Sequence, residues 1–226
     1  MSSAELYINL TNICSNWSAL NSLSNGSAAA VVKANAYGLG IKEVGISLAK
    51  AGARDFFVAI VEEGAELRRA IGQGPKIYVF SGHMVGDTSL IKNFDLIPLI
   101  NSAEQLAFHA ENSADQSIGI QLDTGMNRLG MEGAEFEAIK DIIFKFNPEL
   151  IISHLACADD KSHPMNEKQL NYFNAITDNI DCKKSLAATG GILLGKRYHF
   201  DMTRPGIGLY GGNPYSGSKT VIGLKL

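Results

Sequence analysis

The sequence predicts an α/β fold, a (β/α)8 barrel, and three observations support this. Short apolar segments alternate with amphipathic segments along nearly the whole chain. The apolar segments lack the polar alternation of a half-exposed sheet, which is typical of parallel strands covered on both faces. Eight such segments in 226 residues come close to the roughly 250 residues that this kind of barrel usually takes.

Each expected strand is a short apolar run between turn-forming or amphipathic segments. In chain order the strands span residues 28–33, 55–60, 76–80, 96–100, 117–123, 150–156, 184–189 and, with a weaker pattern, 198–202.

Helices are expected between these strands. Residues 62–71 place acidic side chains in the first turn and basic ones in the last, which complements the helix dipole. Ser102 and Gln105 have the spacing of a capping box, and they predict a helix start there. Residues 135–146 and 166–180 carry apolar residues at helical spacing.

The competing architecture is an open, doubly wound sheet that binds a nucleotide. No expected strand ends in Gly-x-Gly-x-x-Gly, and the sequence has no Gly-x-x-x-x-Gly-Lys-[Ser/Thr] loop. The barrel is therefore the favoured architecture.

Composition limits the cellular setting. A net charge of −3 gives no electrostatic reason to expect binding to nucleic acid or a membrane surface. No apolar run approaches the roughly 20 residues of a bilayer span, and the first residues lack the pattern of a signal peptide. Cys14, Cys157 and Cys182 are odd in number and show no Cys-x-x-Cys spacing. We therefore expect a cytoplasmic protein without disulfides.

The two ends of the chain predict a second domain. A strand-like run at about residues 4–10 precedes the first helix, and residues 220–226 form another strand-like run with no partner strand after it. An isolated strand cannot satisfy its backbone polar groups. We therefore expect residues 1–213 to form the barrel, with the N-terminal strand packing on a second domain. Residues 214–226 are expected to be a linker and the first strand of a β-rich C-terminal domain that is largely missing.

Lys33 ends the first expected strand, on the side where barrel active sites lie. Lysine is rarely buried without a partner or a task, and its amine becomes nucleophilic when it is desolvated or close to other cations. Position alone favours the plainer interpretation of a lysine whose stem packs along the barrel rim. The residues that follow Lys33 change this balance.

Four segments resemble motifs of the alanine racemase family, in the same order along the chain. They are residues 31–40 (VVKANAYGLG), 121–130 (QLDTGMNRLG), 154–159 (HLACAD) and 204–211 (RPGIGLYG). The family consists of enzymes that use pyridoxal 5′-phosphate (PLP) and have an N-terminal barrel. The resemblance spans essentially the whole chain.

The resemblance implies how PLP would be held. Lys33 would form the covalent imine with the cofactor and act as one of two bases. The Tyr37 hydroxyl, the Thr189 hydroxyl and the backbone amides of Gly206 and Ile207 would hold the cofactor phosphate. Tyr37 is expected at the start of the first helical turn. The Asn that usually precedes the hydroxyl residue is replaced here by Ala188, so its amide contacts are lost.

The resemblance places Arg204 against the pyridine nitrogen of PLP. Arginine has only donors and keeps its proton, so that nitrogen must accept a hydrogen bond and stay unprotonated. An unprotonated ring withdraws electrons less strongly than a pyridinium. This suits removal and return of a proton better than transamination or decarboxylation. Without the flanking motif, an arginine in an ion pair would be the plainer interpretation.

The remaining assignments concern the substrate side. His154 would lie beside the cofactor ring and bond the second base, and Arg128 would orient the substrate carboxylate or the phenolic oxygen of the cofactor. The family often has a carbamylated lysine where this chain has Gln121, so amide hydrogen bonds or a bound anion would have to position Arg128 instead. His154, Cys157 and the acidic and histidine residues after them match no closed zinc-site spacing, and we expect no metal.

The resemblance predicts interconversion of L-alanine and D-alanine for peptidoglycan precursors. The second base would be a tyrosine from the C-terminal domain of a neighbouring subunit in a homodimer. The chain alone would then be weakly active or inactive. Two alternatives stay open: a single-domain PLP-binding protein of cofactor homeostasis, and a racemase of serine or another small amino acid.

Overall fold

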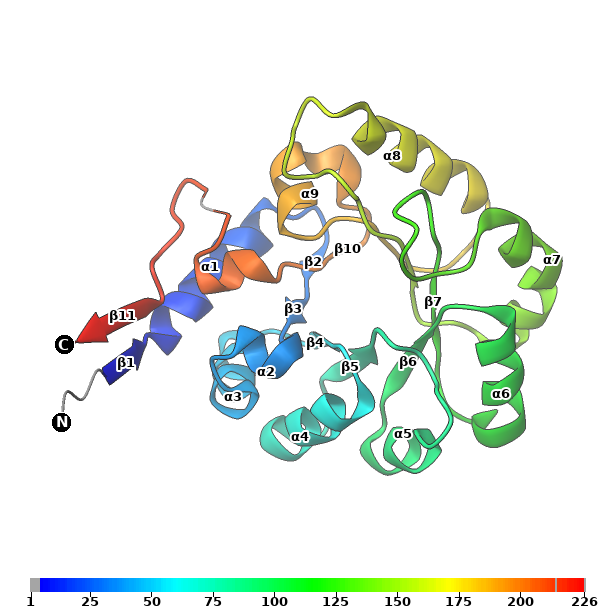
Figure 1. Cartoon of the computed structure of the whole chain (residues 1–226), viewed down its shortest axis with the longest axis horizontal. Helices are drawn as coiled ribbons and strands as arrows, with labels where there is room; N and C mark the ends of the chain where they lie inside the picture. The colour runs from blue at the N-terminus through cyan, green and yellow to red at the C-terminus, as the bar shows by residue number, and fades with distance from the viewer. Residues whose placement is uncertain (1–4, 214, 226) are drawn as a thin grey trace.

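A ring of parallel strands forms the centre of the molecule. The computed structural model describes residues 5–213 and 215–225 (Figure 1). Seven strands pair in chain order to form one curled parallel sheet. They are β3 (Ala30–Val31), β4 (Asp55–Val58), β5 (Lys76–Val79), β6 (Ile97–Ile100), β7 (Gly119–Gln121), β8 (Ile151–Ile152) and β9 (Lys184–Ser185).

An eighth strand position closes the ring. Strand β10 (Met202–Thr203) pairs in parallel with β2 (Ser27–Ala28), which leads into β3 after a single residue. On its other side, a parallel bridge joins Arg204 to Ala188, and the Arg204 amide donates to Ala187 O at 2.8 Å. The (β/α)8 barrel predicted from the sequence is confirmed.

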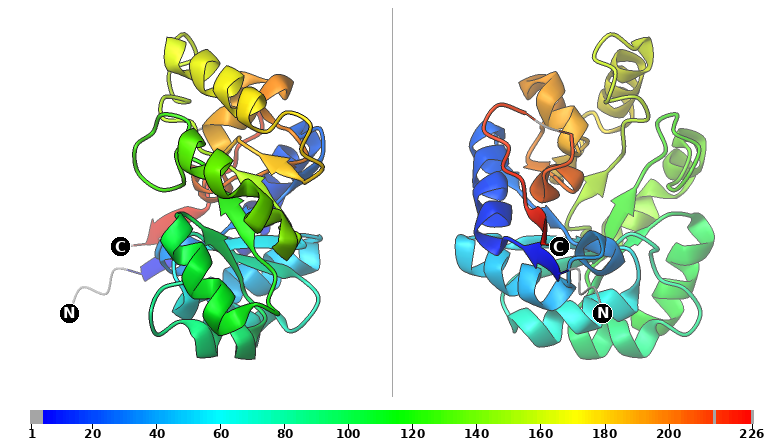
Figure 2. Two further views of the ribbon diagram at one scale, coloured as in Figure 1. Left: turned by 90° about the vertical axis from the view of Figure 1, so that its right-hand side faces the viewer. Right: turned by 60° about the vertical axis from the view of Figure 1, so that its left-hand side comes forward.

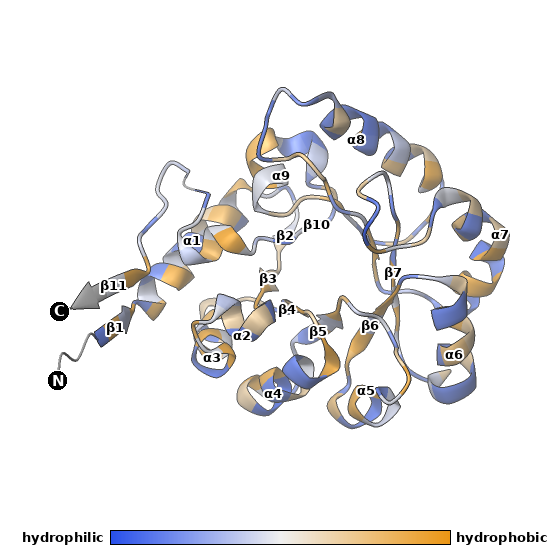
Figure 3. Cartoon of the chain, in the orientation of Figure 1, coloured by the Kyte–Doolittle hydropathy of each residue, from blue (hydrophilic) through white to orange (hydrophobic). Residues whose placement is uncertain are grey.

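Helices cover the outside of this ring (Figures 1 and 2). They are α1 (Leu10–Leu23), α3 (Ile41–Ala51), α4 (Val61–Ile71), α5 (Thr88–Phe94), α6 (Ala103–Ser113), α7 (Gly133–Ile143), α8 (Pro164–Ile176) and α9 (Thr189–Leu194). Figure 3 shows that they carry hydrophilic as well as hydrophobic residues. Ser102 caps α6 by accepting from the Gln105 amide at 3.2 Å, as its spacing predicts. None of the helices in the described part of the chain is both long and apolar enough to span a bilayer.

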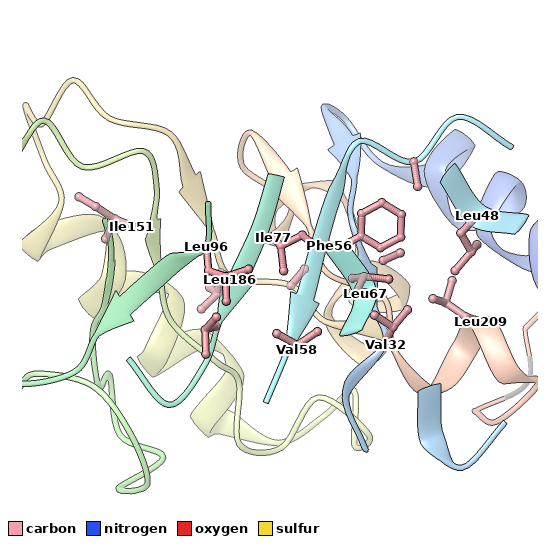
Figure 4. Packing of buried hydrophobic residues seen from close by; sticks show 14 of the residues in the cluster. Val32, Leu48, Phe56, Val58, Leu67, Ile77, Leu96, Ile151, Leu186 and Leu209 are labelled. Atoms are coloured by element: carbon pink, nitrogen blue, oxygen red, sulfur yellow. The ribbon is translucent and has the colours of Figure 1, made fainter. Parts of the chain in front are cut away.

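Neighbouring residues of one strand pack on opposite sides of the barrel wall. Phe56 belongs to the layer between strands and helices, of which Figure 4 shows part. Phe57, the next residue, belongs to a second cluster made of strand residues such as Tyr78 and Leu99, which fills the barrel interior. Because both faces of each strand are buried, the strands lack polar alternation.

Three short 3-10 segments complete the barrel part of the chain: η1 (Phe144–Phe146), η2 (Lys196–Tyr198) and η3 (Ile207–Tyr210). Segment η2 corrects the expected strand at 198–202, because the strand there comprises only Met202 and Thr203. The helix expected at 166–180 ends at Ile176. The hydroxyl of the next residue, Thr177, donates a hydrogen bond to Phe173 O at 2.7 Å.

The two end strands pair with each other. Strand β1 (Glu5–Ile8) runs antiparallel to β11 (Ile222–Lys225), and the pair lies beside the ring at the left of Figure 1. Both were expected as strands, and because they pair with each other the last one is not isolated. Asn16 in α1 fixes the preceding linker, because it donates to Lys219 O at 2.9 Å and accepts from Lys219 N at 2.7 Å. The expected domain boundary at residue 214, like residues 1–4 and 226, lies outside the described residues.

Candidate active site

A cavity of about 740 Å³ opens at the carboxyl ends of the strands. It brings together every site residue that the sequence predicts: Lys33, Tyr37, Arg128, His154, Thr189, Arg204, Gly206 and Ile207. Sequence reasoning missed other wall residues, which include Phe80, Ser81, Met84 and Gln105. These four follow β5 or belong to α6, and no motif in the sequence marks them as site residues; Gln105 stands out only for its place at the start of a helix.

Lys33 lies two residues after the end of β3, half-buried at the cavity wall. Its Nζ is 5.8 Å from the centre of the Phe80 ring, within reach of a cation–π contact. Burial lowers the pKa of the Lys33 amine below its ordinary value; the nearby Arg128 charge lowers it further, and Glu63 opposes the shift. A lowered pKa increases the fraction of neutral, nucleophilic amine at neutral pH.

The segment after Lys33 is a left-handed turn. Four consecutive residues other than glycine, Ala34 to Tyr37, have φ between 52° and 56°. Such a backbone costs about 1–2 kcal/mol per residue, so tertiary contacts must hold it. Asn35 accepts from Ile41 N at 2.8 Å through its side chain and donates its own amide to Glu63 Oε1 at 3.2 Å. The expectation that Tyr37 starts an ordinary helical turn is wrong. The turn forms the segment α2 (Lys33–Tyr37).

The far wall contains a close approach between Tyr37 and the backbone at Gly206. A β-carbon at Gly206 would lie 2.4 Å from the Tyr37 hydroxyl oxygen, so any other residue there would force the Tyr37 side chain to shift. The buried Thr189 hydroxyl accepts from the amides of Gly206 and Gly208, at 3.2 Å each. This hydroxyl therefore fixes the loop that follows Arg204.

Arg204 is 2% exposed and has no carboxylate partner within salt-bridge distance among the described residues. Its Nη1 donates to Ser185 Oγ at 2.5 Å, and its Nη2 donates to Ser153 O at 2.6 Å. The guanidinium also lies over the Phe57 ring, with Cζ 5.9 Å from the ring centre. Burial lowers the pKa of Arg204 to about 9, so it still carries its charge at neutral pH. The ion-pair interpretation of this arginine therefore does not hold.

His154 follows β8 and is neutral at physiological pH. Burial lowers its pKa to about 3, and the positive charges of Arg204, Arg128 and Lys33 contribute to this shift. A neutral imidazole has one donor and one acceptor nitrogen. His154 can therefore hold or pass a proton without adding a fourth cation to the cavity.

Arg128 lies on an exposed loop at the cavity mouth. The Asp123 carboxylate shapes this loop by accepting from the amides of Gly125 and Met126, at 2.8 and 2.9 Å. The buried Gln121 donates to Leu129 O at 3.3 Å, whereas its Oε1 has no hydrogen-bond partner. The side-chain amide of Gln121 thus binds the backbone of the loop, and its Oε1 remains available as an acceptor.

The part of the chain that the structure describes contains no cluster of three or more His, Cys, Asp or Glu that could hold a metal ion. The cavity instead combines three cationic side chains with a phenol and backbone amides. Such a donor set is suited to a small anionic ligand.

Comparisons with known proteins agree with this site. The family model described as "Alanine racemase, N-terminal domain" matches residues 8–214. A curated alanine racemase of Cereibacter sphaeroides is 56% identical, and the match covers 100% of this chain and 65% of the relative. One of Rhizobium meliloti is 47% identical, with 96% and 59% covered. The chain therefore spans about two thirds of the length of these relatives or slightly less.

Solved structures are similar over almost the whole chain. An alanine racemase of Bartonella henselae, described as having covalently bound pyridoxal phosphate, has a TM-score of 0.91 and 33% identity, covering 99% of this chain and 69% of that one. The biosynthetic alanine racemase of Pseudomonas aeruginosa also has a TM-score of 0.91, with 32% identity, 99% of this chain covered and 66% of that one. Barrel, cavity and motifs thus agree with the family match, and the chain belongs to the alanine racemase family through its N-terminal domain.

Proposed function

We propose that this chain is the PLP-binding barrel domain of an alanine racemase, with residues 214–226 leading into a further β-rich domain. One observation carries the proposal. Lys33, with a lowered pKa, and Arg204, a buried guanidinium that no carboxylate of the described residues pairs with, line one cavity at the carboxyl ends of the strands. A buried charge without a partner is costly, and an acceptor bound in the cavity would reduce that cost.

The residues present fit PLP. The ligand is small, flat and anionic, and the cavity wall offers cations and neutral donors. Glu63, which raises the pKa of Lys33, is not one of the residues that line the cavity. Gly206 lets the Tyr37 hydroxyl approach its backbone closely, because a β-carbon there would lie 2.4 Å from the phenol oxygen. A phenol and a glycine-containing loop are thereby brought together, which suits the binding of a phosphate.

When bound, PLP would supply the covalent link to Lys33 and withdraw electrons from the substrate Cα. The Lys33 amine, once released from that link, would take a proton from Cα on one face or return it there. The Tyr37 hydroxyl and the Ile207 amide would bind the phosphate, and Thr189, whose hydroxyl accepts from the Gly206 amide, would fix the loop that carries them.

Arg204 would donate to the ring nitrogen and keep it unprotonated, because a guanidinium has no acceptor and keeps its own proton. This limits electron withdrawal to what proton exchange at Cα needs. His154 would stay neutral beside the ring. Arg128, at the mouth, would orient a carboxylate of the substrate.

The second base is proposed to come from outside the described residues. Tyr37 is the tyrosine among the described residues that lines the cavity. Tyr210 donates its hydroxyl to Val31 O at 3.0 Å, and Tyr215 donates to Asn16 O at 3.0 Å. Burial raises the pKa of both phenols, so both keep their protons at neutral pH and cannot accept one from a substrate there. A tyrosine of the C-terminal domain of a second subunit would complete the site in a cytoplasmic homodimer that makes D-alanine for peptidoglycan.

Two measurements test the proposal. The protein is incubated with PLP, reduced with borohydride and digested, and the modified peptide is identified. Covalent PLP at Lys33, absent in Lys33→Ala, is expected; no adduct, or an adduct elsewhere, would overturn the proposal. The conversion of L-alanine to D-alanine is then compared between this chain alone and the protein as its gene encodes it. We expect turnover in the second and feeble or no turnover in the first, whereas full turnover by the chain alone would refute an external second base.

A further inference from the structure

Within the described part of the chain, the Arg204 side chain donates hydrogen bonds to two groups only, and both are neutral. They are the Ser185 hydroxyl, 2.5 Å from Nη1, and the Ser153 carbonyl, 2.6 Å from Nη2. Both serines are buried, with exposed fractions of 0% and 1%. A buried arginine is usually paired with a carboxylate, so this neutral arrangement calls for a reason.

The direction of the Ser185 hydroxyl is fixed by its two contacts. Its Oγ donates to Met202 O at 2.6 Å. A hydroxyl has one proton, so the contact with Arg204 must use an oxygen lone pair. Arginine has only donors, which agrees with this assignment. Ser185 therefore presents a lone pair to Nη1 in one orientation.

Ser185 connects the Arg204 side chain to the backbone of the strand that precedes it. Ser185 ends β9, whereas Met202 lies two residues before Arg204 in the adjacent β10 segment. The hydroxyl thus ties the guanidinium to the backbone of the segment that carries it. The two hydrogen bonds use one N–H of each Nη, so the Nε–H and the second N–H of each Nη remain as donors outside them.

We propose that Ser185 is a positioning residue that fixes the Arg204 guanidinium and, because its hydroxyl is neutral, leaves the full positive charge to an acceptor in the cavity. This inference rests on the proposed function, since the acceptor would be the ring nitrogen of PLP. A carboxylate at position 185 would hold the arginine equally well but would neutralise it. Sequence reasoning missed Ser185 because a lone serine in an apolar strand carries no motif.

The test uses the protein as its gene encodes it, loaded with PLP that is isotope-labelled at the ring nitrogen. Two quantities are measured: the equilibrium affinity for PLP and the nuclear magnetic resonance shift of that nitrogen, which reports its hydrogen bonding. For Ser185→Ala we expect about tenfold weaker PLP binding, or about 1.4 kcal/mol, and a changed nitrogen shift. Ser185→Cys keeps the size with a weaker hydrogen-bonding atom and should change both quantities in the same direction. Ser185→Thr keeps the hydroxyl, so the ring-nitrogen shift should stay at its wild-type value.

A matched control separates this role from simple loss of a buried hydroxyl. Thr203, also 0% exposed and next to Arg204 in sequence, contacts Ser24 Oγ at 2.7 Å through its hydroxyl. Thr203→Val should lower stability without changing the nitrogen shift. If both Ser185→Ala and Ser185→Cys match the wild type in shift and affinity, or if Thr203→Val changes the shift as they do, the inference is wrong. Failure of the wild type to bind PLP at Lys33 would instead overturn the proposed function.

Discussion

The backbone at Gly206 and the hydroxyl of Tyr37 approach so closely that a β-carbon on Gly206 would lie 2.4 Å from the phenol oxygen. The two residues come from opposite ends of the barrel sequence, and both line the cavity. The close approach of the two residues therefore depends on the absence of a side chain at position 206.

Gly206→Ala should weaken PLP binding by about tenfold or more, because the methyl group displaces the Tyr37 hydroxyl or the ligand. The same substitution in a Tyr37→Phe background should cost less, since the clashing oxygen is gone. Equilibrium titration with PLP of all four proteins gives the coupling between the sites. Gly223→Ala, where the nearest atom to an added β-carbon is 3.8 Å away, is the control. Equal losses in both backgrounds would contradict a clash at Tyr37.

Two charged neighbours should shift the pH dependence of Lys33 reactivity in opposite directions. Arg128 lowers the pKa of Lys33 and Glu63 raises it. The neutral amine is the reactive form, so the rate of covalent bonding to PLP should rise with pH through this lowered pKa. Arg128→Gln should move the midpoint of that profile to higher pH, and Glu63→Gln should move it to lower pH. Stopped-flow rates across pH check this, and shifts of the same sign in both variants would contradict the electrostatic explanation.

The left-handed turn makes a glycine substitution favourable at one alanine. Ala34 is exposed and has φ of 52°, a conformation that glycine adopts without steric cost. Ala34→Gly is expected to leave the free energy of unfolding unchanged or to raise it by up to about 1 kcal/mol. Ala138→Gly, at an exposed site inside the right-handed helix α7, should lower it by about 1 kcal/mol. Urea unfolding of both variants makes the comparison, and equal destabilisation would argue against the turn.

Acid should destabilise the PLP-free protein partly through His154. Its folded-state pKa of about 3 lies below the unfolded value, so the unfolded chain binds more protons between these values and stability falls as pH decreases. Between pH of about 7 and about 5 this histidine should cost about 2 kcal/mol. His154→Asn should reduce the loss measured by urea unfolding at the two pH values. His163→Asn, at the exposed N-cap of α8, should retain it; equal losses in all three proteins would count against the assignment.

The fold was predictable because hydrophobic burial acts on both faces of the strands. Phe56 and Phe57 are both apolar since one faces the helices and the other faces the barrel interior. Strand ends were less predictable. The strand expected at 150–156 is reduced to Ile151 and Ile152, because the backbone then turns to form the cavity wall and Ser153 O accepts from Arg204.

The site was predictable where a motif carries it and unpredictable where tertiary contacts do. Lys33 and Arg204 stand in recognisable segments, and the structure places both in the cavity. The sequence of the turn at Ala34 to Tyr37 is compatible with an ordinary right-handed helix. The contact between Glu63 and the Asn35 amide helps to hold the left-handed conformation instead. Ser185 acquires its role through Met202 and Arg204, which lie seventeen and nineteen residues away.

The seam between β10 and β2 has a consequence for how the protein is made. All other parallel pairs join strands that follow one another in the chain, whereas this seam joins Thr203 to Ala28. Such a non-local contact forms only after most of the chain has left the ribosome. Lys33 lies just beyond one side of the seam and Arg204 just beyond the other. A nascent chain therefore cannot assemble the proposed vitamin-binding centre before β10, the last strand of the ring, is inserted, and cofactor uptake would mark a finished barrel.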